Sequence, residues 1–189
     1  MKIFKEKKQH RYKGYNYSLP GAYFVTICTW NKQPFFGDMI NGGMVLSEVG
    51  LLADRYLREI PDHFPFIKLD EHIIMPDHVH GIIWILENSG NSGESGSTKF
   101  CVPTSRTGYQ NKFGPQSKNL SSIIRGFKIG VTKYAKINDL DFAWQSRFYD
   151  RIIRNDAELD RIRLYIRKNP ANWEREKNRP ENFNKLFNA

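Results

Sequence analysis

The chain has 189 residues, two cysteines and a formal net charge of +9, with a sequence pI near 9.5. A chain of this length can bury a core without disulfides, and Cys28 and Cys101 lack the spacing of a zinc or redox motif. The charged first residues exclude a signal peptide, and no apolar run reaches the ~20 residues of a membrane span. We therefore expect a single cytoplasmic domain over residues 1–189, with no membrane partner.

Positive charge is concentrated at the two ends of the sequence. Residues 1–17 contain six basic residues and the single acid Glu6, and residues 120–189 contain fifteen basic and nine acidic residues. Such asymmetry is typical of nucleic-acid-binding proteins, but an ordinary solvated surface can show it too. We interpret residues 1–17 as a basic arm, and the charge alone leaves both explanations open.

Apolar and turn-forming residues predict the elements of the first half. Residues 21–30 (GAYFVTICTW) are β-branched and aromatic and predict a buried strand, and residues 37–45 predict a short strand or hairpin. Ser47 is a suitable N-cap for an amphipathic helix that Pro61 should close.

Two apolar runs, 66–75 and 78–86, flank Pro76-Asp77 and predict adjacent antiparallel strands. Residues 87–119 then change to Ser, Gly, Asn and Thr, with too few apolar side chains to offset the entropy of ordering. We expect a flexible insertion there.

The second half predicts a helix over 120–136, a strand within 144–154 and a last helix. Asn155 should cap this helix, which we expect to end at Asn169 because Pro170 disfavours helical geometry in the residue before it. The order of elements lacks the βα rhythm of a doubly wound fold. It predicts an α+β protein, an antiparallel sheet with helices on one face, ferredoxin-like or RNA-recognition-like.

His78 and His80 lie two residues apart in a predicted strand, so their imidazoles share one face. Two such rings can bind a divalent ion and leave open positions for water or a phosphate oxygen, but they also suit the solvated face of a sheet. Asn169 could supply a third ligand to Mg²⁺ or Mn²⁺, or simply end its helix.

Tyr165 is the candidate nucleophile among nine tyrosines. It lies one helical turn before Asn169 at the edge of the apolar stripe, and a packed aromatic with its hydroxyl on water would lie there too. Arg161 and Lys168 are close enough on the helix to hold a phosphate. Tyr134 and Tyr149 are rival nucleophiles.

Other basic and aromatic residues are candidate DNA contacts. The basic arm could track a phosphate backbone, and alternate residues of the predicted strand near 150 would share a face on which bases could stack. The full predicted nucleic-acid-binding set is Lys7, Lys8, Arg11, Lys13, Arg147, Tyr149, Arg151, Arg154, Arg161 and Lys168.

Three segments together carry a family resemblance: residues 76–83 (PDHVHGII), 143–154 (AWQSRFYDRIIR) and 165–170 (YIRKNP). In this order they resemble the single-tyrosine HUH transposases of small insertion-sequence type, and most closely the REP-associated tyrosine transposases.

The resemblance implies a specific activity and site. His78 and His80 match the HUH metal ligands, Tyr165 matches the nucleophile, and Asn169 falls where the family places a polar residue, often glutamine, that assists the metal. The implied function is nicking and rejoining of single-stranded DNA at hairpin or palindromic repeats, through a 5′-phosphotyrosine intermediate, with Mg²⁺ or Mn²⁺. The implied protein is a monomer or homodimer associated with the nucleoid.

Two other functions stay open from the residues alone. One is a non-enzymatic module that binds single-stranded nucleic acid through its sheet. The other is a metal-dependent phosphoesterase that uses water as nucleophile and in which Tyr165 is structural.

Overall fold

The computed structural model of the chain describes residues 15–87, 100 and 118–177, with the backbone alone for 174–177. Almost all of the predicted basic arm and of the insertion at 87–119 lies outside the described residues.

A four-stranded antiparallel sheet forms the centre of the described structure. Its strands are β1 (Gly21–Cys28), β4 (Ile67–Met75), β5 (His78–Ile85) and β6 (Tyr149–Ile153), in the order β4-β5-β1-β6. This confirms the predicted strands at 21–30, 66–75 and 78–86 within a few residues.

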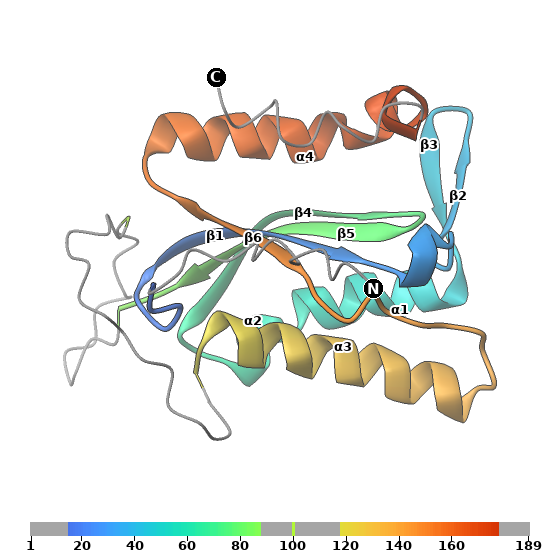
Figure 1. The fold of residues 1–189 in the computed structure, drawn as a ribbon, viewed down its shortest axis with the longest axis horizontal. Coiled ribbons are helices and arrows are strands. Elements are labelled where there is room, and N and C mark those ends of the chain that lie inside the picture. The colour runs from blue at the N-terminus through green and yellow to red at the C-terminus, as the bar shows by residue number, and fades with distance from the viewer. Residues whose placement is uncertain (1–14, 88–99, 101–117, 178–189) are drawn as a thin grey trace, which may run out of the picture.

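Helices cover both faces of the sheet, and not one face as the order of elements suggested. Helices α1 (Glu48–Arg58) and α3 (Leu120–Ile137) pack on one face, and α4 (Asp156–Lys177) lies across the other (Figure 1). The reason lies in the central strands, because every residue of β1 is buried and nearly every residue of β5. A strand that is apolar on both sides needs a cover on both sides.

Local signals explain where the helices begin. The Ser47 hydroxyl accepts a hydrogen bond of 3.1 Å from the Gly50 amide at the start of α1, and Asn119 forms a capping box with Ser122 at the start of α3. A four-residue helix, α2 (Ile60–His63), follows α1 and contains the predicted breaker Pro61.

Two smaller elements complete the fold. A 3-10 turn, η1 (Trp30–Lys32), follows β1, and a hairpin of β2 (Gly37–Ile40) and β3 (Gly43–Leu46) precedes α1. Asn41 and Gly42, which join β2 to β3, have φ angles of 51° and 76°, as a tight hairpin turn requires.

The strand predicted within 144–154 is shorter than expected. Thr26 of β1 pairs with Tyr149, but the next contact is an isolated bridge between Thr29 and Trp144. Two residues separate the two threonines while four separate their partners, so the longer segment bulges away from the sheet. Regular pairing therefore starts only at Tyr149.

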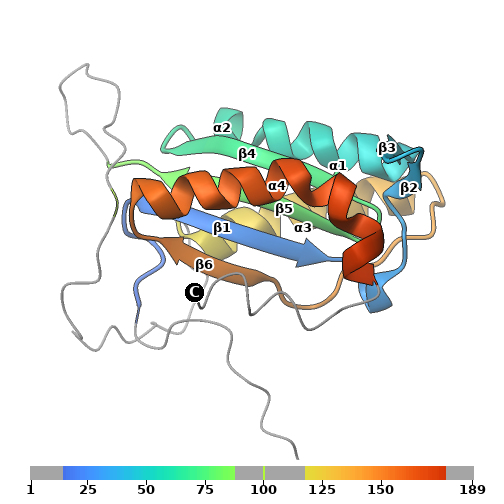
Figure 2. The same cartoon turned by 90° about the horizontal axis from the view of Figure 1, so that it is seen from above.

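Helix α4 begins as predicted and ends later. The Glu158 amide donates a 2.9 Å hydrogen bond to the Asn155 side chain, which confirms Asn155 as the cap. The predicted end at Asn169 is wrong, because α4 continues through Pro170 to Lys177. A proline inside a helix costs about 3 kcal/mol, so packing of the turns that follow must offset that cost. Figure 2 shows these last turns lying over the C-terminal end of β1.

Candidate active site

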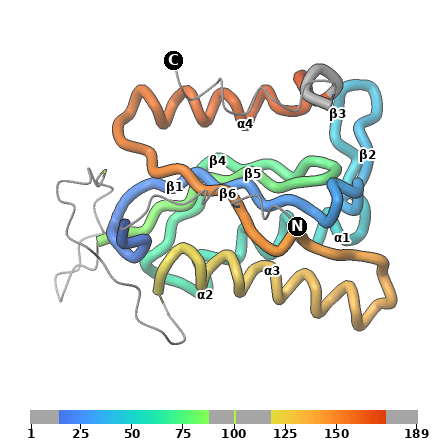
Figure 3. The backbone as a smooth tube through the Cα atoms, viewed as in Figure 1, coloured from blue at the N-terminus to red at the C-terminus, as the bar shows by residue number. Residues whose placement is uncertain are grey.

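The face of the sheet under α4 carries both histidines of the HUH-like segment. Alternation along β5 directs His78, His80 and Ile82 to this face, and Phe24 and Thr26 of β1 point the same way. Apart from the polar groups near His80, the layer is apolar. The tube view shows α4 running above this layer (Figure 3).

His80 and Tyr165 meet in the layer between the sheet and α4. The Tyr165 hydroxyl lies 3.3 Å from His80 Nε2, although the residues are 85 positions apart in the sequence. Tyr165 is 8% exposed, and the Phe24 ring packs against both side chains. The structure therefore brings one predicted ligand and the predicted nucleophile together within a single chain.

Both imidazoles are held through their Nδ1 atoms. His78 Nδ1 donates to Asp77 Oδ1 at 2.5 Å, and His80 Nδ1 lies 2.9 Å from the Thr26 hydroxyl. The two ring centroids are 4.4 Å apart. Because Nδ1 is already engaged in each ring, Nε2 is the atom available to a ligand, which is the arrangement that outer hydrogen-bond partners impose on metal-binding histidines.

Along α4, Asn169 lies midway between the two residues of this helix that contact the histidines. Tyr165, one turn earlier, contacts His80, and Trp173, one turn later, contacts His78 with a ring-centroid distance of 5.8 Å. Asn169 is 1% exposed, and within the described residues neither atom of its carboxamide has a hydrogen-bond partner. An unsatisfied buried amide is costly, so both of its polar atoms are open to a partner such as an ordered water or a ligand.

Burial keeps His80 neutral. Loss of water around the ring lowers the pKa of His80 well below its ordinary value, and the nearby His78 lowers it further. A hydrogen bond with the Val25 backbone raises this pKa and opposes the two effects in part. A neutral imidazole is the form that binds metal ions.

The donor set fits a divalent cation. His78 Nε2 is buried without a hydrogen-bond partner in the part of the chain that the structure describes, and so is the Asn169 carbonyl oxygen. His80 Nε2 lies beside the Tyr165 hydroxyl. The described residues contain no cluster of three His, Cys, Asp or Glu side chains, so a site here would have two imidazoles and one amide. Such a set leaves room for phosphate oxygens and suits Mn²⁺ better than Mg²⁺.

The predicted DNA contacts are distributed around this centre. Arg161 and Lys168 are exposed on α4 beside Tyr165, and Arg147 and Arg154 are exposed at the two ends of β6. Arg147 precedes β6, so it does not share a strand face with Tyr149 and Arg151 as the sequence suggested. Predicted contacts Lys7, Lys8, Arg11 and Lys13 lie outside the described residues.

Arg151 has a structural partner. Its Nε donates a 2.6 Å hydrogen bond to Glu158, whose side chain is 7% exposed. The other oxygen of Glu158 accepts from the Arg154 amide at 2.9 Å. Arg151 therefore helps to fix the start of α4 on β6, a structural role that is separate from its predicted contact with DNA.

The two rival tyrosines lie in different places. The Tyr134 hydroxyl donates to Glu48 at 2.9 Å, and both residues belong to the helices on the opposite face of the sheet from α4. Tyr149 lies directly beside Thr26 on the face of the histidines. Tyr149 is therefore the matched control for Tyr165 in any test of the nucleophile.

Sequence reasoning missed three residues of the site: Thr26, Asp77 and Trp173. Asp77 could have been found as the neighbour of His78. Thr26 becomes visible only once the register of β1 against β5 is known. Trp173 is missed because Pro170 predicts that the helix ends before this residue.

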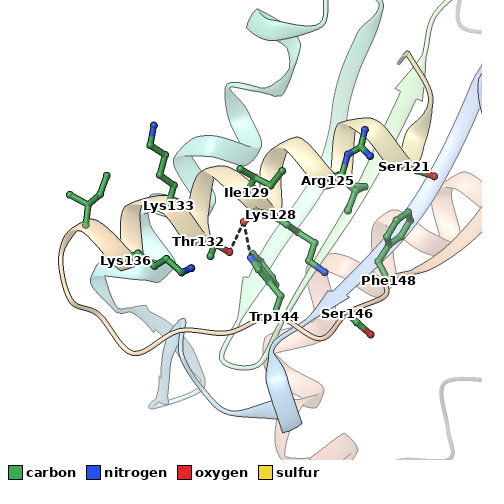
Figure 4. A pocket seen from close by; sticks show the side chains of 12 residues that line it. Ser121, Arg125, Lys128, Ile129, Thr132, Lys133, Lys136, Trp144, Ser146 and Phe148 are labelled. Carbon is green, nitrogen blue, oxygen red and sulfur yellow. Dashed lines mark hydrogen bonds between the residues drawn. The ribbon is translucent and has the colours of Figure 1, made fainter. Parts of the chain in front are cut away.

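A separate groove of about 790 Å³ lies on the α3 side of the sheet. Arg125, Lys128 and Lys133 of α3 line it, facing Trp144 and Phe148 (Figure 4). Lys128 donates to the Gln145 carbonyl at 2.6 Å and lies over the Trp144 ring. The groove is basic and aromatic, but it is on the far side of the sheet from Tyr165.

Comparison with solved structures identifies the class of fold. The chain superimposes on a REP-associated tyrosine transposase bound to a REP hairpin with a TM-score of 0.54 and 18% identity, over 90% of this chain and 74% of that one. The chain has the fold of the REP-associated tyrosine transposases, an antiparallel sheet flanked by helices. The predicted fold and the resemblance stated from the sequence are confirmed at this level.

Sequence comparison places the chain beside one curated protein. It is 37% identical over 171 residues to an uncharacterized protein of Haemophilus influenzae, which covers 90% of this chain and 91% of the relative. The chain belongs to the same family as that protein. A scan against models of known protein families finds no match. Among the described residues, no helix is long and apolar enough to cross a membrane.

Proposed function

We propose that this protein cleaves and rejoins single-stranded DNA through Tyr165, in the manner of a transposase and at hairpin or palindromic repeats. The observation that carries the proposal is the convergence of the Tyr165 hydroxyl with His80 Nε2, at 3.3 Å, and with the neighbouring His78. The buried, unpaired Asn169 amide lies one turn along α4 from Tyr165. The transposase fold supports it, and so does the hairpin DNA bound to the structural neighbour.

The proposed reaction is an in-line displacement at phosphorus. The Tyr165 oxygen attacks the scissile phosphate, a bond forms between that oxygen and phosphorus, and the bond to the upstream 3′ oxygen breaks. The Tyr165 phenol gives up its proton as the new bond forms, and the departing 3′ oxygen takes up a proton. The products are a 5′-phosphotyrosine and a strand that ends in a 3′-hydroxyl. Since one phosphodiester replaces another, a second 3′-hydroxyl can reverse the step without a nucleotide cofactor.

His78, His80 and Asn169 would hold the Mg²⁺ or Mn²⁺ ion, which polarises the phosphate and offsets charge that develops on it. The chain supplies the rest of the site. Asp77 and Thr26 orient the two rings, and Phe24 packs Tyr165 against His80. The Tyr165 hydroxyl lies within hydrogen-bond distance of His80 Nε2, so the nucleophile and this ring nitrogen are adjacent.

The exposed cations of α4 are the proposed phosphate contacts nearest to the nucleophile. Arg161 and Lys168 are on the outer side of the helix that carries Tyr165, and Arg147 and Arg154 extend the positive surface along β6. Tyr149, beside Thr26, is placed to stack on a base that enters this face.

A covalent adduct tests the proposal. A 3′-labelled hairpin oligonucleotide with a single-stranded flank, incubated with Mn²⁺, should transfer its label to the protein on a denaturing gel, because the downstream fragment stays attached through its 5′ phosphate. Tyr165→Phe should abolish the adduct while binding stays within about threefold of the wild-type value. Tyr149→Phe, on the same face of the sheet, should still form it.

The alternatives give different results in the same assay. A binding module without catalysis would retain the oligonucleotide and release no fragment. A phosphoesterase that uses water would release fragments without an adduct, and Tyr165→Phe would still cleave. Either pattern would reject Tyr165 as the nucleophile.

A further inference from the structure

The last turns of α4 bring an aromatic ring onto a candidate metal ligand. Trp173 lies two turns after Tyr165 on the same side of α4, and its ring centroid is 5.8 Å from that of His78 with 31° between the planes. The indole is half-buried, and its helix reaches this position only because α4 continues through Pro170.

His78 is therefore held from two directions. Asp77 binds Nδ1 at the edge of the ring, and the tilted Trp173 ring packs beside it. A hydrogen bond to one nitrogen still allows the imidazole to tilt about that contact, whereas a second aromatic ring packed against it limits the tilt. With both in place, the buried and unpaired His78 Nε2 has a defined direction.

We propose that Trp173 is a positioning residue that holds His78 ready for the divalent ion. The inference rests on the proposed metal-binding role of His78, His80 and Asn169. In this proposal α4 contributes three residues to the site, spaced one helical turn apart: the nucleophile Tyr165, the ligand Asn169 and the positioning residue Trp173.

Metal affinity measures this role without any catalytic step. Isothermal titration of the full-length protein with Mn²⁺ should give a dissociation constant at least about tenfold higher for Trp173→Ala than for wild type, the usual cost of losing an outer-shell contact of a metal ligand. Trp173→Phe keeps an aromatic ring and should stay within about threefold of wild type. Trp30→Ala, which removes a tryptophan that is 54% exposed, is the matched control and should bind as wild type.

Tryptophan emission gives a second readout with the conservative variant. Mn²⁺ is paramagnetic and quenches a nearby indole, so wild-type emission should fall on titration, with a midpoint at the calorimetric dissociation constant. Trp173→Phe should lose the part of this quenching that comes from Trp173 and keep its affinity. Both variants are compared with wild type in EDTA by thermal melting, so that a general loss of folding is recognised.

The outcomes separate this inference from the proposed function. If wild type binds Mn²⁺ and Trp173→Ala binds equally well, the role of Trp173 is rejected and the metal site stands. If Trp173→Ala fails to fold, Trp173→Leu, which keeps apolar bulk without an aromatic ring, takes its place, and wild-type affinity in that variant rejects the role. A wild-type protein that binds no Mn²⁺ would reject both the metal site and the role of Trp173.

Discussion

Asn169 illustrates how a single residue can trade stability for function. Its carboxamide is fully buried and lacks hydrogen-bond partners within the described residues, in a layer otherwise filled by apolar side chains and the site itself. Burying an unsatisfied amide costs about 1–3 kcal/mol. A fold with no use for the amide would be more stable with an apolar residue at this position, which agrees with the ligand role proposed for Asn169.

Replacing Asn169 by leucine tests that explanation. In EDTA, Asn169→Leu should raise the free energy of unfolding by about 1–2 kcal/mol, because a similar volume is filled without unpaired polar atoms. The variant should also lose the rise in melting temperature that Mn²⁺ gives the wild type. Urea denaturation and thermal melting with and without Mn²⁺ measure both effects.

Asn119 is the matched control for this substitution. It is also a buried asparagine, but it caps α3 and accepts a hydrogen bond from the Ser122 amide at 2.9 Å. Asn119→Leu should therefore destabilise the protein by about 1 kcal/mol. If Asn169→Leu were destabilised to the same extent in EDTA, the amide of Asn169 would have a structural role and not a ligand role.

At the scale of elements, ion pairs fix α4 over the sheet and hence fix the site. Arg163 donates two hydrogen bonds to Asp70 of β4, at 2.8 and 2.7 Å, and Asp70 also accepts from Trp84 Nε1 at 3.0 Å. At the opposite edge of the sheet, Glu158 of α4 accepts a hydrogen bond from Arg151 of β6. The helix that carries Tyr165 is thus attached to both edge strands.

Asp70 should contribute to stability in a pH-dependent way. Burial raises the pKa of Asp70, but the hydrogen bonds from Arg163 and Trp84 outweigh it and hold this pKa below the ordinary value of 3.8. The stabilisation is therefore complete above pH 3.8 and is lost as the pH falls through the lower folded-state pKa. Asp70→Asn should lower the free energy of unfolding by about 1–3 kcal/mol at pH 7, and by less at pH 3, in urea denaturation.

Glu71 provides the comparison on the same strand. Its ion pair with Arg167 joins α4 to β4 as well, but the Arg167 side chain is 63% exposed. Glu71→Gln should cost less than about 1 kcal/mol, as exposed pairs do. Equal losses in the two variants would mean that the Asp70 network is worth no more than a surface pair.

Local chemistry made most elements predictable from the sequence. Runs of β-branched residues gave the strands, and Ser47 and Asn155 gave the helix starts through hydrogen bonds within one turn. Pro170 misled because its local cost is overcome by distant packing on β5. The end of α4 is therefore a tertiary effect that a local pattern does not contain.

The same distinction applies to the site. The strand alternation of His78 and His80 and the helical position of Tyr165 can be read from spacing, and the structure brings these residues together. Thr26 and Trp173 depend on strand register and on the course of a helix through a proline. Neither follows from spacing within one element.

On the scale of the whole molecule, the sheet separates two basic surfaces. Arg161 and Lys168 are exposed on α4, which covers one face of the sheet (Figure 1). Lys133 and Lys136 lie on α3, on the other face, and line the groove of about 790 Å³ (Figure 4). Phosphate contacts to either surface would make binding sensitive to salt, because each neutralised phosphate releases counterions. Only contacts on the α4 surface lie next to Tyr165.

Charge reversal on each surface shows which one guides the scissile strand. For an unstructured single strand, the Arg161→Glu, Lys168→Glu double variant should weaken binding at least tenfold at low salt and flatten the salt dependence by about 0.7 per lost phosphate contact. The Lys133→Glu, Lys136→Glu double variant makes the same change in net charge, so it corrects for long-range electrostatics. It should weaken the same strand less, as measured by fluorescence anisotropy at several salt concentrations. Equal losses would show that net charge alone drives binding, and a larger loss for the α3 pair would move the single-strand path to the groove, away from the nucleophile.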